Sequence, residues 1–200
     1  MDQYPPVAVI MPVLNEERHL AEAVAAIAAQ DYPGELQIAL ALGPSTDRTD
    51  EVASVLHTED PRVRLVPNPT GKTPAGLNAA LAATDAPIVV RVDGHALLPP
   101  DYVRAAVAVL ERTDADNVGG VMAAEGSTDF ERAVACAMRS RLGVGSASFH
   151  TGGQEGPALT VYLGAFKRSA LERVGGYDEA YVRAQDWEMN HRIRQTGGLG

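Results

Sequence analysis

Short apolar runs alternate with amphipathic segments along the first half of the chain. The apolar runs are rich in β-branched residues, as in strands buried on both faces, and they cover residues 7–14, 36–42, 63–68 and 87–93. Segments with helical spacing of apolar residues follow them, at 15–30, 45–57, 73–84 and 101–113. Strands that alternate with helices imply right-handed crossovers. The pattern predicts an α/β fold with a Rossmann-like, mainly parallel central sheet flanked by helices.

The second half of the chain continues this pattern less regularly. It predicts strands at 117–126 and 159–166 and helices at 129–143, 167–176 and 184–196. Residues 143–158 are rich in Gly and Ser and too long for a simple connector, so we expect a substrate loop. Phe149 and His150 could cover the donor there, with His150 as an ordinary exposed residue the favoured alternative. No linker divides the chain, and 200 residues suit a single domain.

Polar residues at the starts of two helices are candidate caps. Asn15 precedes the first helical segment, and Ser45 or Thr46 precedes the second. The single cysteine, Cys136, has apolar neighbours and is expected in the core. "RIRQTGGLG" reads as a helix end followed by a glycine stop, so we expect the natural polypeptide to continue beyond Gly200.

Charge and hydropathy exclude several classes of protein. A net charge of −9 without a Lys/Arg cluster argues against a nucleic-acid partner. No stretch approaches the roughly 18–20 apolar residues that a spanning helix needs, and Asp2 to Pro6 is not a signal peptide. We expect a cytoplasmic protein. A dehydrogenase is disfavoured because no G-x-G-x-x-G follows the first strand.

Polar side chains follow the predicted strands where the strands end. The first strand leads to Asn15 and Glu16, the second to Asp47, and the fourth to Asp93 and His95. Ligands of open parallel sheets bind beyond the carboxyl ends of the strands, so these groups should share one crevice.

Asp93 and His95 flank Gly94, so in an extended chain both side chains project to one side, close enough to share a cation. A carboxylate and an imidazole, completed by ligand phosphates and water, suit Mn²⁺ better than Mg²⁺, which remains the alternative ion. From spacing alone, a simple turn with His95 at the surface is an equal alternative.

Six blocks in this order resemble the inverting family-two glycosyltransferases of the GT-A fold, with closest likeness to bacterial exopolysaccharide glucosyltransferases of the succinoglycan type. The resemblance covers residues 5–198 and identifies a single GT-A domain over 1–200. The blocks are "VAVIMPVLNEERHLAEAVAAIAAQDYP", "GPSTDRT", "GKTPAGLNAAL", "VRVDGHALLPPDYV", "LGAFKRSALERVGGYDE" and "QDWEMNHRIRQTGG".

The resemblance implies roles for three residues. Asp93 and His95 occupy the metal-binding D-x-D position, with His in place of the second Asp. They would hold a divalent cation against the diphosphate of a nucleotide-sugar. Asp186 matches the general base that deprotonates the acceptor hydroxyl, although it could simply cap the last helix.

The resemblance also implies donor contacts, and the residues next to Asp186 suggest acceptor contacts. Trp187 and Glu188 lie beside Asp186 and are candidate acceptor contacts, with Trp187 as a core anchor the equal alternative. Arg91 needs an anionic partner if it is buried, and a pocket carboxylate is the expected one. The donor-binding candidates are Pro12, Asn15, Glu16, Asp47, Lys72, Asn78, Arg91 and Asp93.

Three departures from the family pattern bear on the expected donor and on how far the natural polypeptide continues beyond Gly200. Leu42 stands where relatives have an Asp that reads uracil, so either Asp47 substitutes or another base is read. Gln185 replaces the usual Glu, and no Q-x-x-R-W segment is present. A UDP-sugar remains the expected donor.

The sequence therefore predicts a metal-dependent hexosyltransferase that moves a sugar from a nucleotide-sugar to a saccharide or lipid-linked acceptor in exopolysaccharide biosynthesis. By its resemblance to family members that use lipid-linked acceptors, we expect the protein to associate peripherally with the inner face of the cell membrane. The alternative is a degenerate member that binds nucleotide or glycan without turnover, which the Leu42 departure keeps open.

Overall fold

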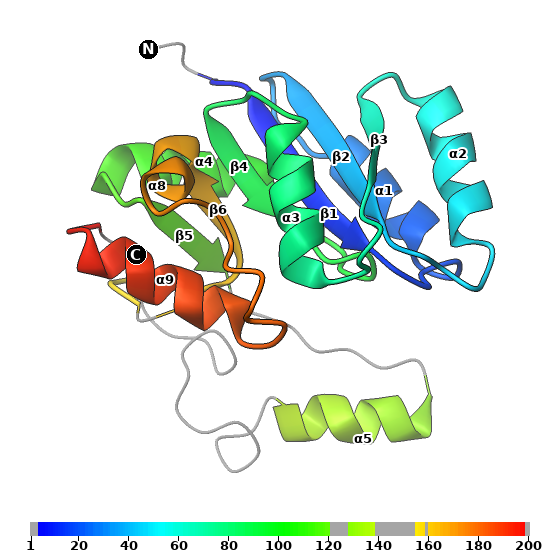
Figure 1. Ribbon diagram of the computed structural model, residues 1–200. Helices are drawn as coiled ribbons and strands as arrows, with labels where there is room; N and C mark the ends of the chain where they lie inside the picture. Colours follow the sequence, from blue (N-terminus) through cyan, green and yellow to red (C-terminus); the bar gives the residue numbers. More distant parts are fainter. Residues whose placement is uncertain (1–3, 121–127, 139–154, 159, 199–200) are drawn as a thin grey trace.

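The computed structural model describes residues 4–120, 128–138, 155–158 and 160–198 (Figure 1). Its strands form one six-stranded open sheet with the order β3-β2-β1-β4-β6-β5. The strands are β1 (Val7–Val13), β2 (Leu36–Leu42), β3 (Val63–Pro67), β4 (Ile88–Arg91), β5 (Asn117–Gly120) and β6 (Tyr162–Lys167). The helices are α1 (Leu20–Ala28), α2 (Thr49–Glu59), α3 (Thr73–Ala82), α4 (Tyr102–Thr113), α5 (Asp129–Met138), α8 (Arg168–Arg173) and α9 (Gln185–Gln195).

The sheet is mainly parallel, which confirms the predicted fold class. β1 pairs in parallel with β2 and β4, and β2 pairs in parallel with β3. β6 is the reversed strand, since it pairs antiparallel with both β4 and β5. The apolar pattern located this strand but contained no information on its direction.

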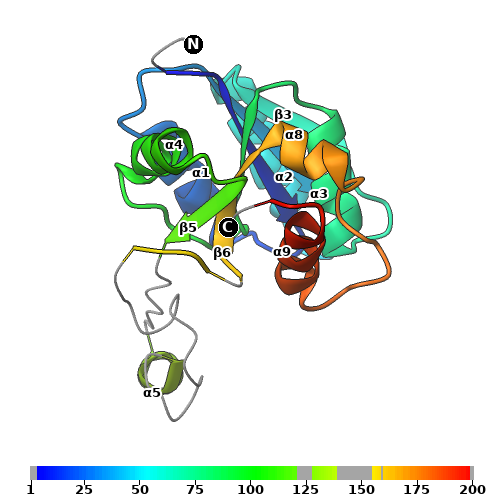
Figure 2. The ribbon, with the colours of Figure 1, turned by 90° about the vertical axis from the view of Figure 1, so that its left-hand side faces the viewer.

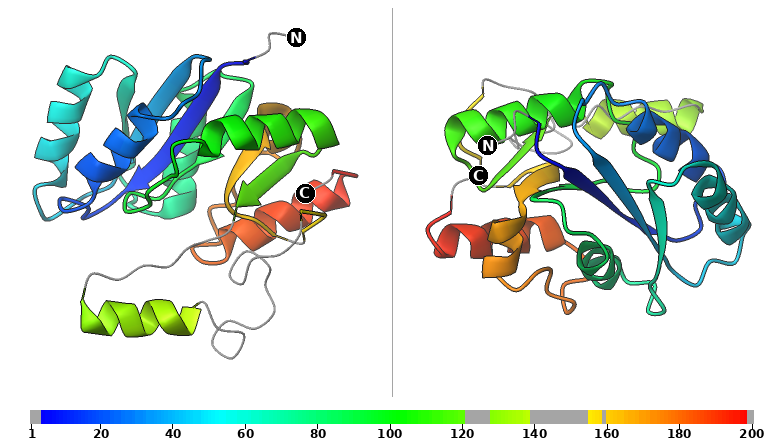
Figure 3. Two further views of the ribbon diagram at one scale, coloured as in Figure 1. Left: turned by 180° about the vertical axis from the view of Figure 1, so that it is seen from behind. Right: turned by 90° about the horizontal axis from the view of Figure 1, so that it is seen from above.

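Helices cover both faces of the sheet (Figure 3). Side chains from alternate strand positions fill the two layers between the sheet and the helices. Val7, Val9 and Met11 of β1 point into the layer under α1, α2 and α4. Ile10 points into the opposite layer, under α3, α8 and α9. Because strands buried on both faces need apolar residues at every position, their sequences are continuous apolar runs.

The predicted caps of the first two helices are wrong. α1 begins at Leu20 and α2 at Thr49, in each case three or more residues after Asn15, Ser45 and Thr46. Asn15 has a positive φ of 57°. The side chain of Asn15 accepts from the backbone of Thr46, and the side chain of Ser45 accepts from the backbone of Asn15. These contacts between the two loops replace the expected helix caps.

Two further expectations concern the segment after β5. Cys136 is exposed, so its expected place in the core is wrong: α5 lies apart from the sheet in two perpendicular views (Figures 1 and 2), and apolar sequence neighbours alone do not bury a residue. Phe149 and His150 lie outside the described residues, as does most of the expected substrate loop. Among the helices of the described ranges, none has the length and apolar character to cross a membrane.

Candidate active site

The loops that follow β1 and β2 are joined at the carboxyl edge of the sheet. The backbone N–H of Asn15 donates to Ser45 Oγ at 3.0 Å, and the backbone N–H of Thr46 donates to Asn15 Oδ1 at 2.8 Å. These reciprocal hydrogen bonds fix the two loops against each other. The side-chain oxygen of Asn15, a predicted donor contact, is therefore already used in building the site.

A buried hydroxyl holds the next residues of the same loops. Thr49 Oγ1 accepts from the backbone N–H of Glu16 at 2.7 Å and donates to Asp47 Oδ1. The other oxygen of Asp47 accepts from the backbone N–H of Glu17 at 3.2 Å. The hydrogen bond from the Thr49 side chain is the main cause that lowers the pKa of Asp47. Both Asp47 oxygens thus brace the loops, and its predicted reading of the base stays a prediction.

The chain turns immediately after β4 with His95 at the surface, so the turn alternative is confirmed and the extended D-x-H geometry is not adopted. The backbone N–H of Ala96 donates to the carbonyl of Asp93 at 2.9 Å, which closes a four-residue turn. The pairing of β4 with β1 ends at Ile10 and Arg91. The next donor on β1 would be Pro12, which has no backbone N–H to continue the hydrogen-bond ladder. The turn, and not strand alternation, sets where Asp93 and His95 point.

His95 contacts the loop that follows β1. Its Nδ1 lies 2.8 Å from Glu16 Oε1, so the ends of β1 and β4 meet at this pair. Gly94 makes the approach possible, because a Cβ at this position would lie 2.9 Å from Glu16 Cγ. Together with the Asn15 and Thr49 contacts, this brings the ends of the first, second and fourth strands together, as predicted.

Arg91 connects Asp93, the candidate metal ligand, with Asp186, the candidate general base. Its side chain is only 5% exposed, its Nη2 donates to Asp93 Oδ1 at 3.1 Å, and its Nη1 donates to Asp186 Oδ1. Burial acts to lower the pKa of Arg91, but the Asp186 and Asp93 carboxylates outweigh it and raise the pKa above its usual range. The expected pairing of a buried Arg91 with pocket carboxylates is confirmed.

Asp186 lies in the first turn of α9, where its carboxylate meets Arg91 from β4. Its side chain does not cap the helix, so the capping alternative is wrong. Burial raises the pKa of Asp186, Arg91 opposes this effect, and the Asp93 charge adds to it. A carboxyl whose pKa is raised accepts a proton more readily than an ordinary aspartate, which suits a general base.

Asp93 and His95 each keep one atom available to a divalent cation, and metal binding by this pair stays a prediction. Within the described residues, Asp93 Oδ2 and His95 Nε2 have no hydrogen-bond partner, so one oxygen and one nitrogen are free to bind. No group of three or more His, Cys, Asp or Glu side chains in this part of the chain is placed to hold a metal ion. Two protein ligands leave positions for phosphate oxygens and water, as Mn²⁺ or Mg²⁺ would need.

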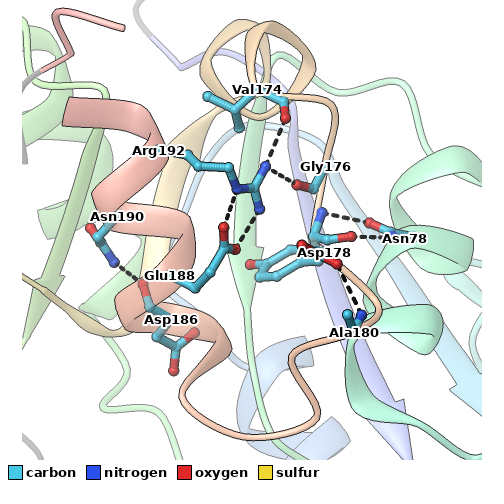
Figure 4. Close-up of polar contacts among 10 residues, drawn as sticks. Asn78, Val174, Gly176, Asp178, Ala180, Asp186, Glu188, Asn190 and Arg192 are labelled. Atoms are coloured by element: carbon cyan, nitrogen blue, oxygen red, sulfur yellow. Dashed lines mark hydrogen bonds and ion pairs between the residues drawn. The ribbon is translucent and has the colours of Figure 1, made fainter. Parts of the chain in front are cut away.

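The remaining donor candidates lie on or near α3. Lys72 is exposed and precedes the first turn of the helix. Asn78 binds the segment before α9: its Oδ1 accepts from the backbone N–H of Tyr177 at 2.8 Å, and its Nδ2 donates to the Tyr177 carbonyl at 2.8 Å (Figure 4). Asn78 therefore positions the segment leading to Asp186, and its expected contact with the donor stays a prediction.

Trp187 and Glu188, the two acceptor candidates, have different environments. Trp187 is 54% exposed and stacks on His191 with the ring centroids 5.5 Å apart, so the core-anchor alternative is wrong. Glu188 is buried and pairs with Arg192, whose Nη1 also donates to the carbonyls of Val174 and Gly176 (Figure 4). The Glu188 carboxylate is used to anchor α9, and an acceptor contact from it is untested.

Two residues of the site have no clear signal in the sequence. Thr49 is fully buried, although it looks like an ordinary polar residue at a helix start. Tyr177 is buried near Arg91 and Asp186, and burial raises its pKa above the usual range. Among the described residues its hydroxyl has no hydrogen-bond partner. Only the long-range packing of the chain identifies these two residues.

The six-stranded sheet flanked by helices matches the GT-A fold of solved glycosyltransferases. The mannosyltransferase PcManGT from Pyrobaculum calidifontis, solved with GDP-Man and Mn²⁺, superposes with a TM-score of 0.75 and 27% identity, covering 99% of this chain and 54% of its own. TarS of S. aureus, solved with UDP-GlcNAc, superposes with a TM-score of 0.71 and 17% identity, covering 94% of this chain and 53% of its own, and it supports the fold alone.

Residues 8–175 match the family described as Glycosyl transferase family 2, and the chain belongs to this family. The succinoglycan biosynthesis protein ExoA of Rhizobium meliloti (strain 1021) is 33% identical over 191 residues. This alignment covers 94% of the chain and 58% of ExoA. The chain thus spans little more than half the length of this relative and of the solved structures.

Replacing Arg91 with methionine should destabilise the fold strongly. The substitution leaves the Asp93 and Asp186 carboxylates without their shared cation, and breaking a buried pair in this way costs about 3–5 kcal/mol. Urea unfolding measures the change. Arg48→Met, which removes the exposed pair with Glu51, is the control and should change the midpoint far less. Equal effects of the two substitutions would contradict the role assigned to Arg91.

Proposed function

We propose that this chain forms the donor-binding and catalytic part of a metal-dependent, inverting glycosyltransferase. It moves a sugar from a nucleotide-sugar to a hydroxyl group of a saccharide or lipid-linked acceptor. The observation that carries this proposal is the Arg91 guanidinium, which binds both Asp93 and Asp186. One buried cation thereby joins the candidate metal ligand and the candidate base in a single site.

The donor is a nucleoside diphosphate sugar held at the carboxyl edge of the sheet. Asp93 Oδ2 and His95 Nε2 are the atoms that would bind a divalent cation, which neutralises charge on the diphosphate as it leaves. The relative PcManGT was solved with GDP-Man and Mn²⁺, which supports this ligand class. The mixed oxygen and nitrogen set favours Mn²⁺ over Mg²⁺.

The base of the nucleotide is the least constrained part of the donor. Leu42 ends β2 with an apolar side chain, and both oxygens of Asp47 already accept hydrogen bonds within the loops. Leu42 has no polar atom to read uracil, whereas Asp47 Oδ2 accepts only the Glu17 N–H and has a further acceptor site. A UDP-sugar remains our proposed donor, with a GDP-sugar as the competitor to test beside it.

Transfer takes place in one displacement. The acceptor oxygen forms a bond to the anomeric carbon while the bond to the diphosphate oxygen breaks, and the leaving diphosphate keeps the electron pair. Asp186 takes the proton of the acceptor hydroxyl. Arg91 holds the Asp186 carboxylate in position throughout. Attack from the face opposite the leaving group inverts the anomeric configuration.

The acceptor sugar binds beside α9. Trp187 directly follows the proposed base and presents a ring that is 54% exposed, with His191 stacked in parallel against it. Aromatic rings pack well on the apolar faces of sugars. The likeness to ExoA supports a place in exopolysaccharide biosynthesis, where a lipid-linked acceptor would bring the enzyme to the inner face of the cell membrane.

Asp186→Asn should reduce kcat by about 10²- to 10⁴-fold, because an amide cannot accept the proton of the acceptor hydroxyl. Initial rates of transfer from the donor measure the effect. The KM for the donor serves as a control and should change little, and rates are compared at a temperature where thermal unfolding shows both proteins folded, since the variant loses one anionic partner of Arg91. If the variant retained more than about a tenth of wild-type turnover, Asp186 would not be the base.

The activity should fall on the acid side at a higher pH than an ordinary aspartate would produce. Burial raises the pKa of Asp186, so this carboxyl holds its proton to a higher pH, and the protonated form cannot act as a base. Activity is therefore present above the raised pKa and lost as pH falls through it. A kcat profile against pH tests this. The low rate of Asp186→Asn should be flat over the same range, and an acid limb shared by both proteins would contradict the assignment.

Mn²⁺ should be required for a nucleoside diphosphate to stabilise the protein. At a hundredfold excess over Kd, a ligand specific for the folded state adds about 2.7 kcal/mol, or roughly 5–10 °C in Tm for a domain of this size. Thermal unfolding with UDP, GDP and ADP, each with and without Mn²⁺, measures the shift and identifies the base. His95→Ala should lose most of the Mn²⁺-dependent part. Equal metal dependence in both proteins would remove His95 from the site.

A further inference from the structure

A carboxylate from the loop after β1 contacts the imidazole that follows β4. Glu16 Oε1 lies 2.8 Å from His95 Nδ1, and 79 residues separate the two in the sequence. The Glu16 side chain is 17% exposed, whereas that of His95 is 59% exposed. An exposed ring is therefore held by a side chain that is itself well packed.

The position of Glu16 is fixed from two directions. Its backbone N–H donates to the buried hydroxyl of Thr49 at 2.7 Å, which sets where the side chain starts. Gly94 lies under the side chain, and any Cβ there would come within 2.9 Å of Glu16 Cγ and 3.3 Å of its Cδ. The glycine between Asp93 and His95 thus gives Glu16 the space to reach the imidazole.

This contact determines which nitrogen of His95 is free. A carboxylate can only accept hydrogen bonds, so Nδ1 carries the hydrogen in the pair with Glu16. In the neutral ring Nε2 then has the lone pair, and among the described residues it has no partner. Metal-binding histidines commonly donate their second ring N–H to a carboxylate in this manner, which fixes both tautomer and orientation.

We infer that Glu16 is a positioning residue for the metal site, which acts by holding His95 with Nε2 available to the cation. The inference rests on the proposed metal-dependent function and replaces the direct donor contact expected for Glu16. An aspartate at position 95 could bind a cation through either oxygen, whereas a neutral histidine can do so only through the nitrogen that carries no hydrogen. The carboxylate of Glu16 is therefore the partner that makes histidine effective at this position.

Mn²⁺ affinity measures the role without any transfer assay. Titration followed by electron paramagnetic resonance, with saturating UDP or GDP, gives the Kd of the protein-bound ion. Glu16→Ala should weaken binding about 10- to 100-fold, the usual effect of removing a carboxylate behind a metal-binding histidine. Glu16→Gln should restore part of the affinity, because its amide oxygen still accepts from Nδ1. Glu22→Ala, which removes an exposed acid from α1, is the control and should bind as wild type does.

Two further variants separate positioning from direct contact. In a His95→Asp background, Glu16→Ala should leave Mn²⁺ affinity unchanged or slightly tighter, since no imidazole remains to be oriented. Gly94→Ala in the natural background should imitate Glu16→Ala, because the added methyl group displaces the Glu16 side chain. Nitrogen hyperfine coupling to Mn²⁺ should be present in wild type and absent from His95→Asp.

The outcomes distinguish this inference from the proposed function. If wild type binds Mn²⁺ but Glu16→Ala binds it equally well, the positioning role fails and the metal-dependent function stands. An equal loss in the natural background and in the His95→Asp background would show that Glu16 contacts the ion or nucleotide itself, and it too overturns the inference. If wild type binds no Mn²⁺ with either nucleotide, the metal-dependent function fails and the inference fails with it.

Discussion

The structure depends on one buried guanidinium. Arg91 ends β4 with almost no access to solvent, and a buried cation is stable only when anions neutralise it. Its two partners come from the turn after β4 and from the start of α9, the latter 95 residues away along the chain. The charge requirement of Arg91 therefore fixes the first turn of the last helix beside the end of β4 and assembles the site.

The fold follows from sequence wherever burial alone decides it. Strands β1 and β2 are apolar at nearly every position, because both faces are covered, and their bounds differ little from the predicted ones. The starts of α1 and α2 could not be predicted, because Asn15 and Ser45 bind each other across two loops. The reversed direction of β6 is a property of the chain path, which local periodicity does not contain.

The candidate site was predicted as a set of residue types but not as a set of contacts. The charge of Arg91 indicated an acidic partner, and the family blocks indicated Asp93 and Asp186. The use of Asn78 to hold Tyr177, and of Glu188 to hold Arg192, depends on which backbone groups lie nearby after folding. Family motifs therefore mark positions near the chemistry without separating residues that touch a ligand from residues that support them.

The segment before α9 is exposed to solvent, whereas the helix itself packs into the core. Met189 and Ile193 anchor α9 in the core, while Tyr181 and Val182 of the preceding segment are exposed. The core packing of Met189 and Ile193 thus holds the helix independently of the exposed side chains of Tyr181 and Val182. Substitutions at these exposed positions therefore leave unchanged the packing that holds the helix and, with it, the contact between Arg91 and Asp186.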